Sequence, residues 1–206
     1  MTLDLFHAHK TNRELTFENA DAIKGLKLHF DFINDAEEKE LITNIDNNEW
    51  LADLKRRVQQ YGYKYDYKAR RIEKSFYIGN IPDWMNFLSA RMIEKGIIDF
   101  KPDQAIVNEY VDDQGISAHI DCEPCFDDTI ISISLGGSCV FNFEREPNSK
   151  EKIPFFLEAK TLVVMTGESR FNWYHGIPNR KSDDFNGTKH KRGRRISITF
   201  RKVKLN

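Results

Sequence analysis

Cysteine is scarce in this sequence, which has three among its 206 residues. Three are too few for the disulfide framework of a small secreted domain and are typical of a reducing compartment. The sequence also lacks any apolar run near the ~20 residues that a membrane-spanning helix needs, and its first ten residues contain no secretory signal core. We therefore expect an intracellular protein, cytoplasmic or nuclear, that has no membrane anchor. We also expect a monomer.

An excess of charge of either sign is missing too, because 31 Lys and Arg stand against 32 Asp and Glu. This balance argues against a protein that coats nucleic acid through a globally basic surface, although it allows local basic patches. Repeats, low-complexity tracts and linker-like segments are also absent. With 40% apolar and 12% aromatic residues, the chain can form a packed core, and we expect a single domain over residues 1–206.

The first half of the chain contains patterns typical of helices. The segment Gly25–Phe32 alternates weakly and predicts a short strand, followed by a helix that Asn34 or Asp35 would cap. A second helix is expected after Pro82, because apolar residues recur there every three or four positions, and Gly96 suits its end. Such amphipathic helices would cover one side of a sheet.

From residue 105 onward the apolar pattern changes to short runs rich in β-branched and aromatic residues. Six runs separated by turn residues predict strands over Ala105–Tyr110, Thr129–Leu135, Ser138–Phe143, Pro154–Leu157, Thr161–Met165 and Arg195–Val203. Residues 178–191 are polar, contain Asn-Gly, and are expected to form a long loop. Helices followed by many short strands favour an α+β fold with an antiparallel double sheet, of which the jelly-roll barrel, or double-stranded β-helix, is a natural example.

A candidate metal site begins at His119-Ile120-Asp121. On an extended backbone, residues two apart point to the same side, so this imidazole and this carboxylate can converge on one ion. Among the remaining histidines, His175 is the best third ligand, because it follows the strand predicted over Thr161–Met165. Two histidines and one carboxylate with open positions opposite are the ligand set of non-haem Fe(II) oxygenases. The alternative is a solvated His–Asp pair in a loop.

The last predicted strand carries a second unusual pattern. Its alternation places Arg195, Ser197, Thr199 and Arg201 on one face and apolar residues on the other. Two arginines directed toward a barrel interior would be costly without anionic partners, and a dicarboxylate co-substrate would supply them with bidentate geometry. The alternative is an edge strand whose two arginines lie in solvent.

Together these motifs resemble one known family. The chain is similar to the AlkB family of Fe(II)- and 2-oxoglutarate-dependent dioxygenases in four motifs taken in order, which are Asn108-Glu-Tyr110, His119-x-Asp121, His175 and Arg195-x-Ser-x-Thr-Phe-Arg201. The matching region runs from about residue 106 to residue 203. Within it, segments 162–170 and 193–203 look closest to the branch that includes the tRNA-wobble-uridine hydroxylase.

The resemblance implies a role for each motif residue. Fe(II) would be held by His119, Asp121 and His175. The co-substrate 2-oxoglutarate would be bound by Asn108, Tyr110, Arg195, Ser197 and Arg201, with Arg195 and Tyr110 at its distal carboxylate and Asn108 and Arg201 near its metal-chelating end. The implied chemistry consumes 2-oxoglutarate and O₂, releases succinate and CO₂, and hydroxylates a C–H bond of the substrate; an N-methyl group oxidised in this way leaves as formaldehyde.

The resemblance also divides the single domain into helices and a nucleotide-recognition lid over residues 1–104 and a jelly-roll catalytic core over residues 105–206. Between Lys55 and Lys74, eight basic residues, two acidic residues and four tyrosines occur together, a local net charge of +6 (8 − 2). Basic groups attract phosphates and aromatic faces stack on unpaired bases. The predicted substrate contacts are Tyr61, Tyr63, Tyr65, Arg70 and Glu123. For the basic, tyrosine-rich segment, the alternative is a charged hairpin whose tyrosines enter the core. For Glu123, the alternative is a surface glutamate in a loop.

Three functions remain open at this point. The favoured one is a dioxygenase that demethylates alkylated bases, single-stranded or flipped, in DNA or RNA. A second is oxidation of a protein, a small molecule or a tRNA nucleoside by the same centre, and a third is a non-catalytic barrel used as a binding module. Cys122 and Cys125 form a C-x-x-C beside the metal motif, but without a second pair they do not indicate a zinc site, and Cys139 is expected in the core.

Overall fold

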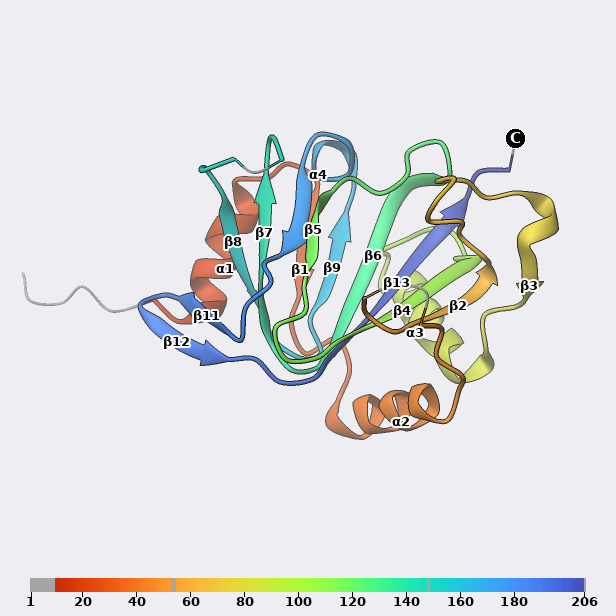
Figure 1. Cartoon of the computed structure of the whole chain (residues 1–206), viewed down its shortest axis with the longest axis horizontal. Coiled ribbons are helices and arrows are strands. Elements are labelled where there is room, and N and C mark those ends of the chain that lie inside the picture. Colours follow the sequence, from red (N-terminus) through yellow and green to blue (C-terminus); the bar gives the residue numbers. More distant parts are fainter. Residues whose placement is uncertain (1–9, 53–54, 148, 206) are drawn as a thin grey trace, which may run out of the picture.

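Two antiparallel sheets form the body of the computed structural model, which describes residues 10–52, 55–147 and 149–205 (Figure 1). The larger sheet follows the order β1 (Leu26–His29), β9 (Leu162–Met165), β6 (Phe126–Gly136), β13 (Arg195–Val203), β4 (Gln104–Tyr110), β2 (Val58–Tyr63) and β3 (Tyr77–Gly79). The smaller sheet follows the order β5 (Ile116–His119), β10 (Tyr174–Ile177), β7 (Cys139–Glu144) and β8 (Ile153–Leu157). The predicted α+β double sheet is confirmed.

The described helices lie around these sheets. They are α1 (Asn12–Asp21), α2 (Asp35–Asp46), α3 (Asp83–Glu94), the short α4 (Gly167–Phe171) and the 3₁₀ turn η1 (Lys74–Phe76). None of the helices in the described ranges is long and apolar enough to cross a membrane. The strands β1, β2 and β3, which precede residue 104, pair with the sheet built from later strands, so the larger sheet runs across the predicted division at that residue.

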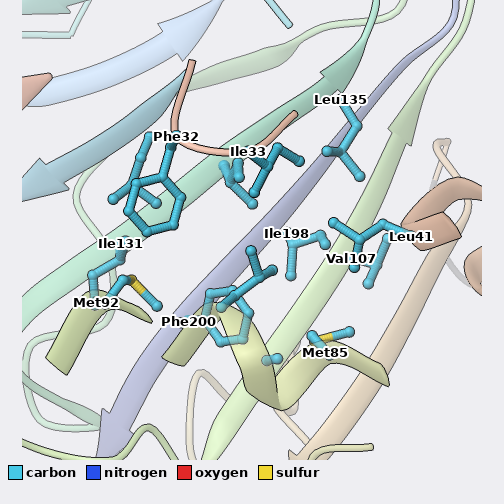
Figure 2. Close-up of a cluster of buried hydrophobic side chains, with 14 of the residues drawn as sticks. Phe32, Ile33, Leu41, Met85, Met92, Val107, Ile131, Leu135, Ile198 and Phe200 are labelled. Carbon is cyan, nitrogen blue, oxygen red and sulfur yellow. The ribbon is translucent and has the colours of Figure 1, made fainter. Parts of the chain in front are cut away.

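Strand β13 lies at the centre of the larger sheet and has two different faces. Ile196, Ile198 and Phe200 are fully buried against residues of α2 and α3, including Leu41 and Met85 (Figure 2). The other face points into the space between the two sheets, where a second core forms from apolar residues of both. The alternation predicted from the sequence therefore gives β13 two buried faces. Its apolar face packs against helices, and its polar face lines the space between the sheets.

Helix α2 begins where the sequence predicted. The Asn34 side chain accepts a hydrogen bond from the backbone of Glu37, and the Glu37 side chain accepts one from the backbone of Asn34, which forms a reciprocal capping box. Glu37 also pairs with Arg91 of α3 over 2.5 Å and 2.9 Å. The start of α2 is therefore held both by its own cap and by the neighbouring helix.

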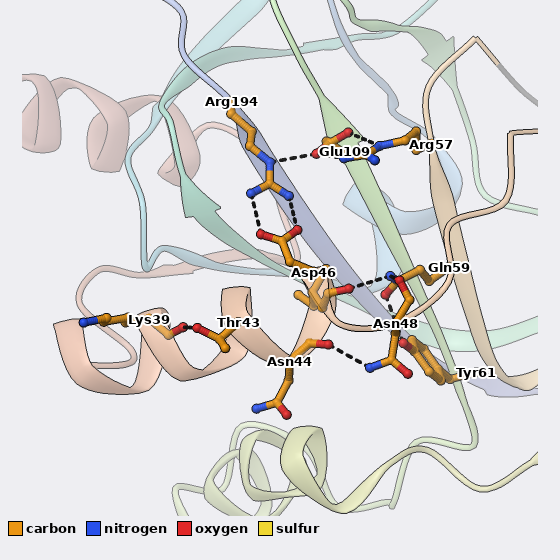
Figure 3. A network of polar contacts seen from close by, with 11 residues as sticks. Lys39, Thr43, Asn44, Asp46, Asn48, Arg57, Gln59, Tyr61, Glu109 and Arg194 are labelled. Atoms are coloured by element: carbon orange, nitrogen blue, oxygen red, sulfur yellow. Dashed lines mark hydrogen bonds and ion pairs between the residues drawn. The ribbon is translucent and has the colours of Figure 1, made fainter.

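A polar network joins the other end of α2 to the sheet (Figure 3). Glu109 of β4 is buried and accepts hydrogen bonds from Arg57 at 2.7 Å and from Arg194 at 2.7 Å. Arg194 also donates to Asp46 at the end of α2, over 2.9 Å. Two arginines on one buried carboxylate lower the pKa of Glu109 and keep it anionic. The network thereby fixes the segment that leads into β13.

Two parts of the fold differ from the sequence prediction. Helix α1 was not predicted because its apolar residues are few, although Thr11 and Glu14 form a capping box that marks its start. Residues 178–191 are not a loop, since they contain the hairpin β11 (Ser182–Phe185) and β12 (Thr188–Lys191). The turn Asn186-Gly187 has φ values of +51° and +70°, which is the geometry that Asn-Gly favours between paired strands.

Candidate active site

A cavity of about 270 Å³ lies between the two sheets. Strands β4 and β13 line one side and β5 and β10 the other, while residues of the segment 55–79, called the lid from here on, line it at the surface. All the residues that the sequence predicted for metal and co-substrate binding line this cavity, namely Asn108, Tyr110, His119, Asp121, His175, Arg195, Ser197 and Arg201. The fold thus brings four distant motifs to one place.

The three predicted metal ligands come from the edge of the smaller sheet. His119 at the end of β5 and His175 on β10 are register partners, and their ring centroids are 4.5 Å apart. Nε2 of His175 lies 3.9 Å from Oδ2 of Asp121. Nδ1 of His119 lies 2.9 Å from the carbonyl oxygen of Ser117, and because a carbonyl only accepts, this nitrogen donates and leaves the Nε2 lone pair free.

The protonation states of the buried pair suit a metal ion. Burial, together with the neighbouring His119, lowers the pKa of His175 to about 3, so its ring is neutral. Burial also opposes ionisation of Asp121, but Arg201 and the neighbouring histidines more than offset it, and its pKa lies below the usual value. A neutral imidazole and an anionic carboxylate are the forms that bind metals.

The fit to Fe(II) rests on this donor set rather than on preformed coordination distances. Within the described ranges, no group of three or more His, Cys, Asp or Glu side chains is already arranged as a metal site. The two imidazoles and the carboxylate nevertheless line one cavity and carry the charges of a facial Fe(II) ligand set. His119, Asp121 and His175 are therefore the residues that would hold the ion.

Arg195 is a buried cation that is only partly paired within the described chain. It is 4% exposed, and its Nη2 donates to the hydroxyl of Ser134 over 2.8 Å, whereas no protein atom accepts from Nε or Nη1 in the part of the chain that is described. Its guanidinium also lies 5.4 Å from the ring centroid of Tyr110. An unpaired buried charge costs several kcal/mol, and a carboxylate in the cavity would accept both N–H groups. The side chain therefore fits the distal carboxylate of 2-oxoglutarate.

The second arginine of β13 contacts the metal motif directly. Arg201 donates to Oδ1 of Asp121 over 3.0 Å and to the side-chain oxygen of Gln104 over 3.1 Å. Its position six residues beyond Arg195 on the same face separates the two guanidinium groups along the cavity wall. Arg201 orients the Asp121 carboxylate, while Ser197 lies between the arginines and shares a hydrogen bond of 2.9 Å with Ser132.

The predicted substrate residues divide into two groups. Tyr65 and Arg70 line the cavity from the lid. Tyr61 does not, because its ring packs edge-on against Trp84 of α3, and burial raises its pKa to about 12. Tyr63 also does not line the cavity; it packs against Tyr77 and the apolar cluster between the sheets.

Glu123 was the remaining predicted substrate contact. Its side chain is exposed in the turn after the metal motif and does not line the cavity. The open alternative, a surface glutamate in a loop, describes this placement.

Sequence reasoning missed three residues at the site. Tyr67 lines the cavity beside Tyr65, with the two rings 5.0 Å apart and edge-on. Arg56 also lines it, and its Nε donates to the Asn108 side chain over 2.9 Å. Arg170 is fully buried and donates to the carbonyls of Asp121 and Cys122. Tyr67 and Arg56 lie in the basic, tyrosine-rich segment, which was the available signal.

Cys122 and Cys125 are joined by a disulfide, contrary to the expectation of reduced cysteines. Both sulfurs lie 3.3 Å from the carbonyl oxygen of Arg70, so the pair touches the lid. The third cysteine, Cys139, is buried in β7 as predicted. Composition alone could not reveal the bridge, because it depends on the turn between two nearby residues.

Comparison with known proteins decides the family. A model of the 2OG-Fe(II) oxygenase superfamily matches residues 35–201. The chain belongs to this superfamily. Its cofactors are accordingly Fe(II), 2-oxoglutarate and O₂. The chain is thus an Fe(II)- and 2-oxoglutarate-dependent dioxygenase, the enzyme class that its motifs predicted.

Individual relatives place the oxygenase more closely. It is 35% identical to the tRNA (carboxymethyluridine(34)-5-O)-methyltransferase ALKBH8 of Macaca fascicularis, with 87% of this chain and 30% of that protein covered. It is 33% identical to the alkylated DNA repair protein ALKBH8 homolog of Arabidopsis thaliana, with 88% and 59% covered. The oxygenase thus spans about a third to three-fifths of the length of these relatives, and the predicted AlkB-like branch is confirmed.

A solved structure supports the fold independently. The structure of OsALKBH1 superposes with a TM-score of 0.67, covers 86% of this chain and 98% of its own, and is 16% identical. At this identity the likeness concerns the fold alone, and it confirms the jelly-roll prediction.

Proposed function

We propose that this oxygenase demethylates alkylated bases in DNA or RNA by oxidation. The observation that carries the proposal is one cavity in which the metal motif and the partly paired Arg195 lie on the walls and two lid tyrosines, Tyr65 and Tyr67, lie at the surface. The protein acts inside the cell as a monomer, with residues 1–206 forming one catalytic domain.

The residues of the chain have distinct tasks in this reaction. Arg195 and Tyr110 bind one end of the co-substrate, and Arg201 keeps the Asp121 carboxylate anionic and oriented. Bound Fe(II), 2-oxoglutarate and O₂ supply the oxidation of an N-methyl C–H bond, after which the product loses formaldehyde and leaves the bare base. Because Asp121 and His175 are buried, the sheets exclude bulk water from the reacting groups.

The lid supports a nucleic-acid substrate. Tyr65 and Tyr67 are half-buried and present aromatic surface to the cavity, and Arg70 adds a cation at its edge. An unpaired base stacks on such rings with about 1–3 kcal/mol per base. Chemistry on a base requires that it leave its stack, which a cavity between two sheets with an aromatic border accommodates.

A second candidate is the hydroxylation of a tRNA nucleoside, an alternative that the sequence left open. The name of the macaque relative refers to a modified uridine of tRNA, and that of the plant relative refers to alkylated DNA. Both reactions would use the same metal and co-substrate residues. They differ in the carbon that is oxidised and in whether formaldehyde leaves.

Succinate release across a substrate panel tests the proposal. The panel holds N-methylated single-stranded DNA, N-methylated RNA, unmethylated controls and tRNA. We expect succinate above background, with formaldehyde, for at least one methylated oligonucleotide. Stimulation by tRNA without formaldehyde would favour the hydroxylase instead, and no stimulation by any nucleic acid would contradict both.

The lid provides the matched variants for this assay. Tyr65→Ala should raise KM for the methylated oligonucleotide by about 5- to 150-fold, the equivalent of one lost stacking contact. Tyr61→Phe changes a tyrosine of the same lid that faces α3, and it should leave this KM unchanged.

A further inference from the structure

A second depression lies beside the active site, on the outer side of the lid. Its walls come from the lid, from the turn that contains Cys125, and from the C-terminal residues Lys204 and Leu205. Figure 1 places the C-terminal end of the chain beside the lid, although more than a hundred residues separate them in sequence. We call this depression the outer groove.

The outer groove adjoins the catalytic cavity. Arg70 lines both of them, and the disulfide links Cys122, which lines the cavity, to Cys125, which lines the groove. The carbonyl of Arg70 rests against both sulfurs, which sets the lid turn at this boundary. A polymer with one unit in the cavity would therefore have its next units in the groove.

The charge of the outer groove is positive. Its basic residues are Arg70, Arg71, Lys74 and Lys204, and its only acidic lining residue in the described chain is Glu73, which pairs with Arg71 over 2.9 Å. Lys204 lies 3.7 Å and 3.9 Å from two exposed aspartates, which offset part of its charge. No carboxylate in the described residues forms an ion pair with Arg70 or Lys74, so a net positive charge remains toward solvent.

The lining between these cations is apolar. Ile72 and Pro124 lie in the groove, and Leu205 is 37% exposed at its edge. A groove with cations along an apolar surface matches the backbone of a single strand, whose phosphates need charge and whose sugars and bases need contact area. An acidic peptide would use the charge but would not explain why the groove lies beside a cavity that suits a base.

We infer that the outer groove binds the sugar-phosphate backbone of the nucleotides that follow the reacting base on one side. Lys74 and Lys204 contact phosphates, while Arg70 stands where the reacting nucleotide meets its neighbour. This inference rests on the proposed function and adds to it the path of the strand outside the catalytic cavity.

Salt-dependent binding tests the inference without any turnover. The probes are fluorescein-labelled single-stranded RNA and DNA of about a dozen nucleotides, with affinity measured by anisotropy between about 50 and 200 mM salt. For the double variant Lys74→Gln/Lys204→Gln, affinity should fall, and the slope of log affinity against log salt should become smaller by about 1.4, since each lost phosphate contact removes about 0.7.

Two control variants separate the loss of charge in the groove from nonspecific effects of mutation. Lys74→Arg/Lys204→Arg keeps both charges and should keep the wild-type slope. Lys27→Gln/Lys39→Gln removes two exposed charges on β1 and α2, outside the groove, and should also keep it.

The outcomes test binding by the outer groove and the proposed demethylase function separately. An unchanged slope in the Gln variant, or wild-type binding without salt dependence, overturns the inference, even if the enzyme demethylates a methylated nucleoside. Loss of slope in the Gln variant supports the groove. If no methylated oligonucleotide then yields formaldehyde, the demethylase proposal falls while the groove stands.

Discussion

At the scale of a single residue, Arg195 is the main evidence for a co-substrate carboxylate in the cavity. The two adjacent arginines, Arg194 and Arg195, point to opposite faces of the chain at the start of β13. Arg194 is exposed and pairs with Asp46 and Glu109, whereas Arg195 is buried in the cavity and donates only to Ser134 among the described residues. Their neighbours, rather than their identity, decide which of them can bind an added carboxylate.

Replacing Arg195 should therefore weaken co-substrate binding. Truncating one partner of a buried charge pair costs about 2–5 kcal/mol, so Arg195→Ala should raise the dissociation constant of 2-oxoglutarate by about 30-fold or more. Calorimetric titration with Mn(II) in place of Fe(II) measures this without turnover. Arg194→Lys, which keeps a cation beside Asp46 and Glu109, is the matched control and should leave the constant unchanged. Equal binding by Arg195→Ala and wild type would contradict the assignment.

Some residues of the site could be predicted from the sequence and others could not. All eight metal and co-substrate candidates line the cavity, but they were predicted on different grounds. The metal pair at residues 119 and 121 and the polar face of the last strand follow strand alternation, which a sequence displays directly, whereas Asn108 and Tyr110 came from the family resemblance. Arg170 could not be predicted, because its role depends on the carbonyls of Asp121 and Cys122, which a distant turn supplies. Tyr61 and Tyr65 look equivalent in sequence, but one faces α3 and the other the cavity.

At the scale of elements, the close approach of β5 and β10 positions the two histidines. Gly176 follows His175, and a Cβ atom there would lie 2.8 Å from the nitrogen of Ala118 and 2.8 Å from the carbonyl oxygen of Ile116. These are backbone atoms of β5 and cannot rotate away. Glycine is therefore what allows the two strands, and with them His119 and His175, to come together.

Gly176→Ala should separate these strands and weaken metal binding. We expect the affinity for Mn(II) to fall by about 10- to 100-fold, the usual effect of disturbing the support of a metal ligand. Electron paramagnetic resonance of the unbound ion measures the affinity. Gly193→Ala is the control, because a Cβ at Gly193 would meet no atom within 4 Å. Wild-type affinity in Gly176→Ala would show that strand spacing does not set the site.

Element boundaries were predictable where local chemistry determines them. A cap at Asn34 or Asp35 and a strand over Arg195–Val203 were both predicted; the structure has the cap at Asn34 and the strand over these residues. The hairpin at residues 182–191 was missed, because its polar strands bury Asp183 with Arg192 instead of following an apolar alternation. An ion pair between residues nine positions apart replaces the pattern on which strand prediction relies.

At the scale of the whole molecule, stability should depend on pH through the pair that links α2 to α3. Arg91 lowers the pKa of Glu37 to about 2, below the value of about 4.3 expected when unfolded. The stabilisation is thus fully present above about pH 4.3 and is lost as the pH falls toward about 2. Because both side chains are about a quarter exposed, we expect a contribution of only about 1 kcal/mol.

Glu37→Gln isolates this contribution, because glutamine still completes the capping box with Asn34. Urea unfolding should show a loss of about 1 kcal/mol at about pH 7 and a smaller loss at about pH 3. Glu40→Gln, an exposed change on the same helix, should show no such dependence. A loss of equal size at both pH values would rule out the ion pair as its cause.

The uneven distribution of charge over the molecule explains how a net charge of −1 is compatible with a nucleic-acid substrate. Basic residues concentrate in the lid and near the C-terminus, and the outer groove brings Lys74 and Lys204 together. Acidic residues gather elsewhere, as in the first turn of α2 with Asp35, Glu37 and Glu38. Overall composition averages over this separation, so it excludes a basic coat protein but not a basic groove.

The most direct test of the account is the coupling of succinate to formaldehyde on a methylated single-stranded oligonucleotide. Both products are measured in the same reaction, for the wild type and for Asp121→Ala. We predict that the wild type releases both in equal amounts, and that Asp121→Ala, which lacks the carboxylate ligand, releases neither. Formaldehyde release that persists in Asp121→Ala, or wild-type succinate release that no methylated oligonucleotide increases, would contradict it.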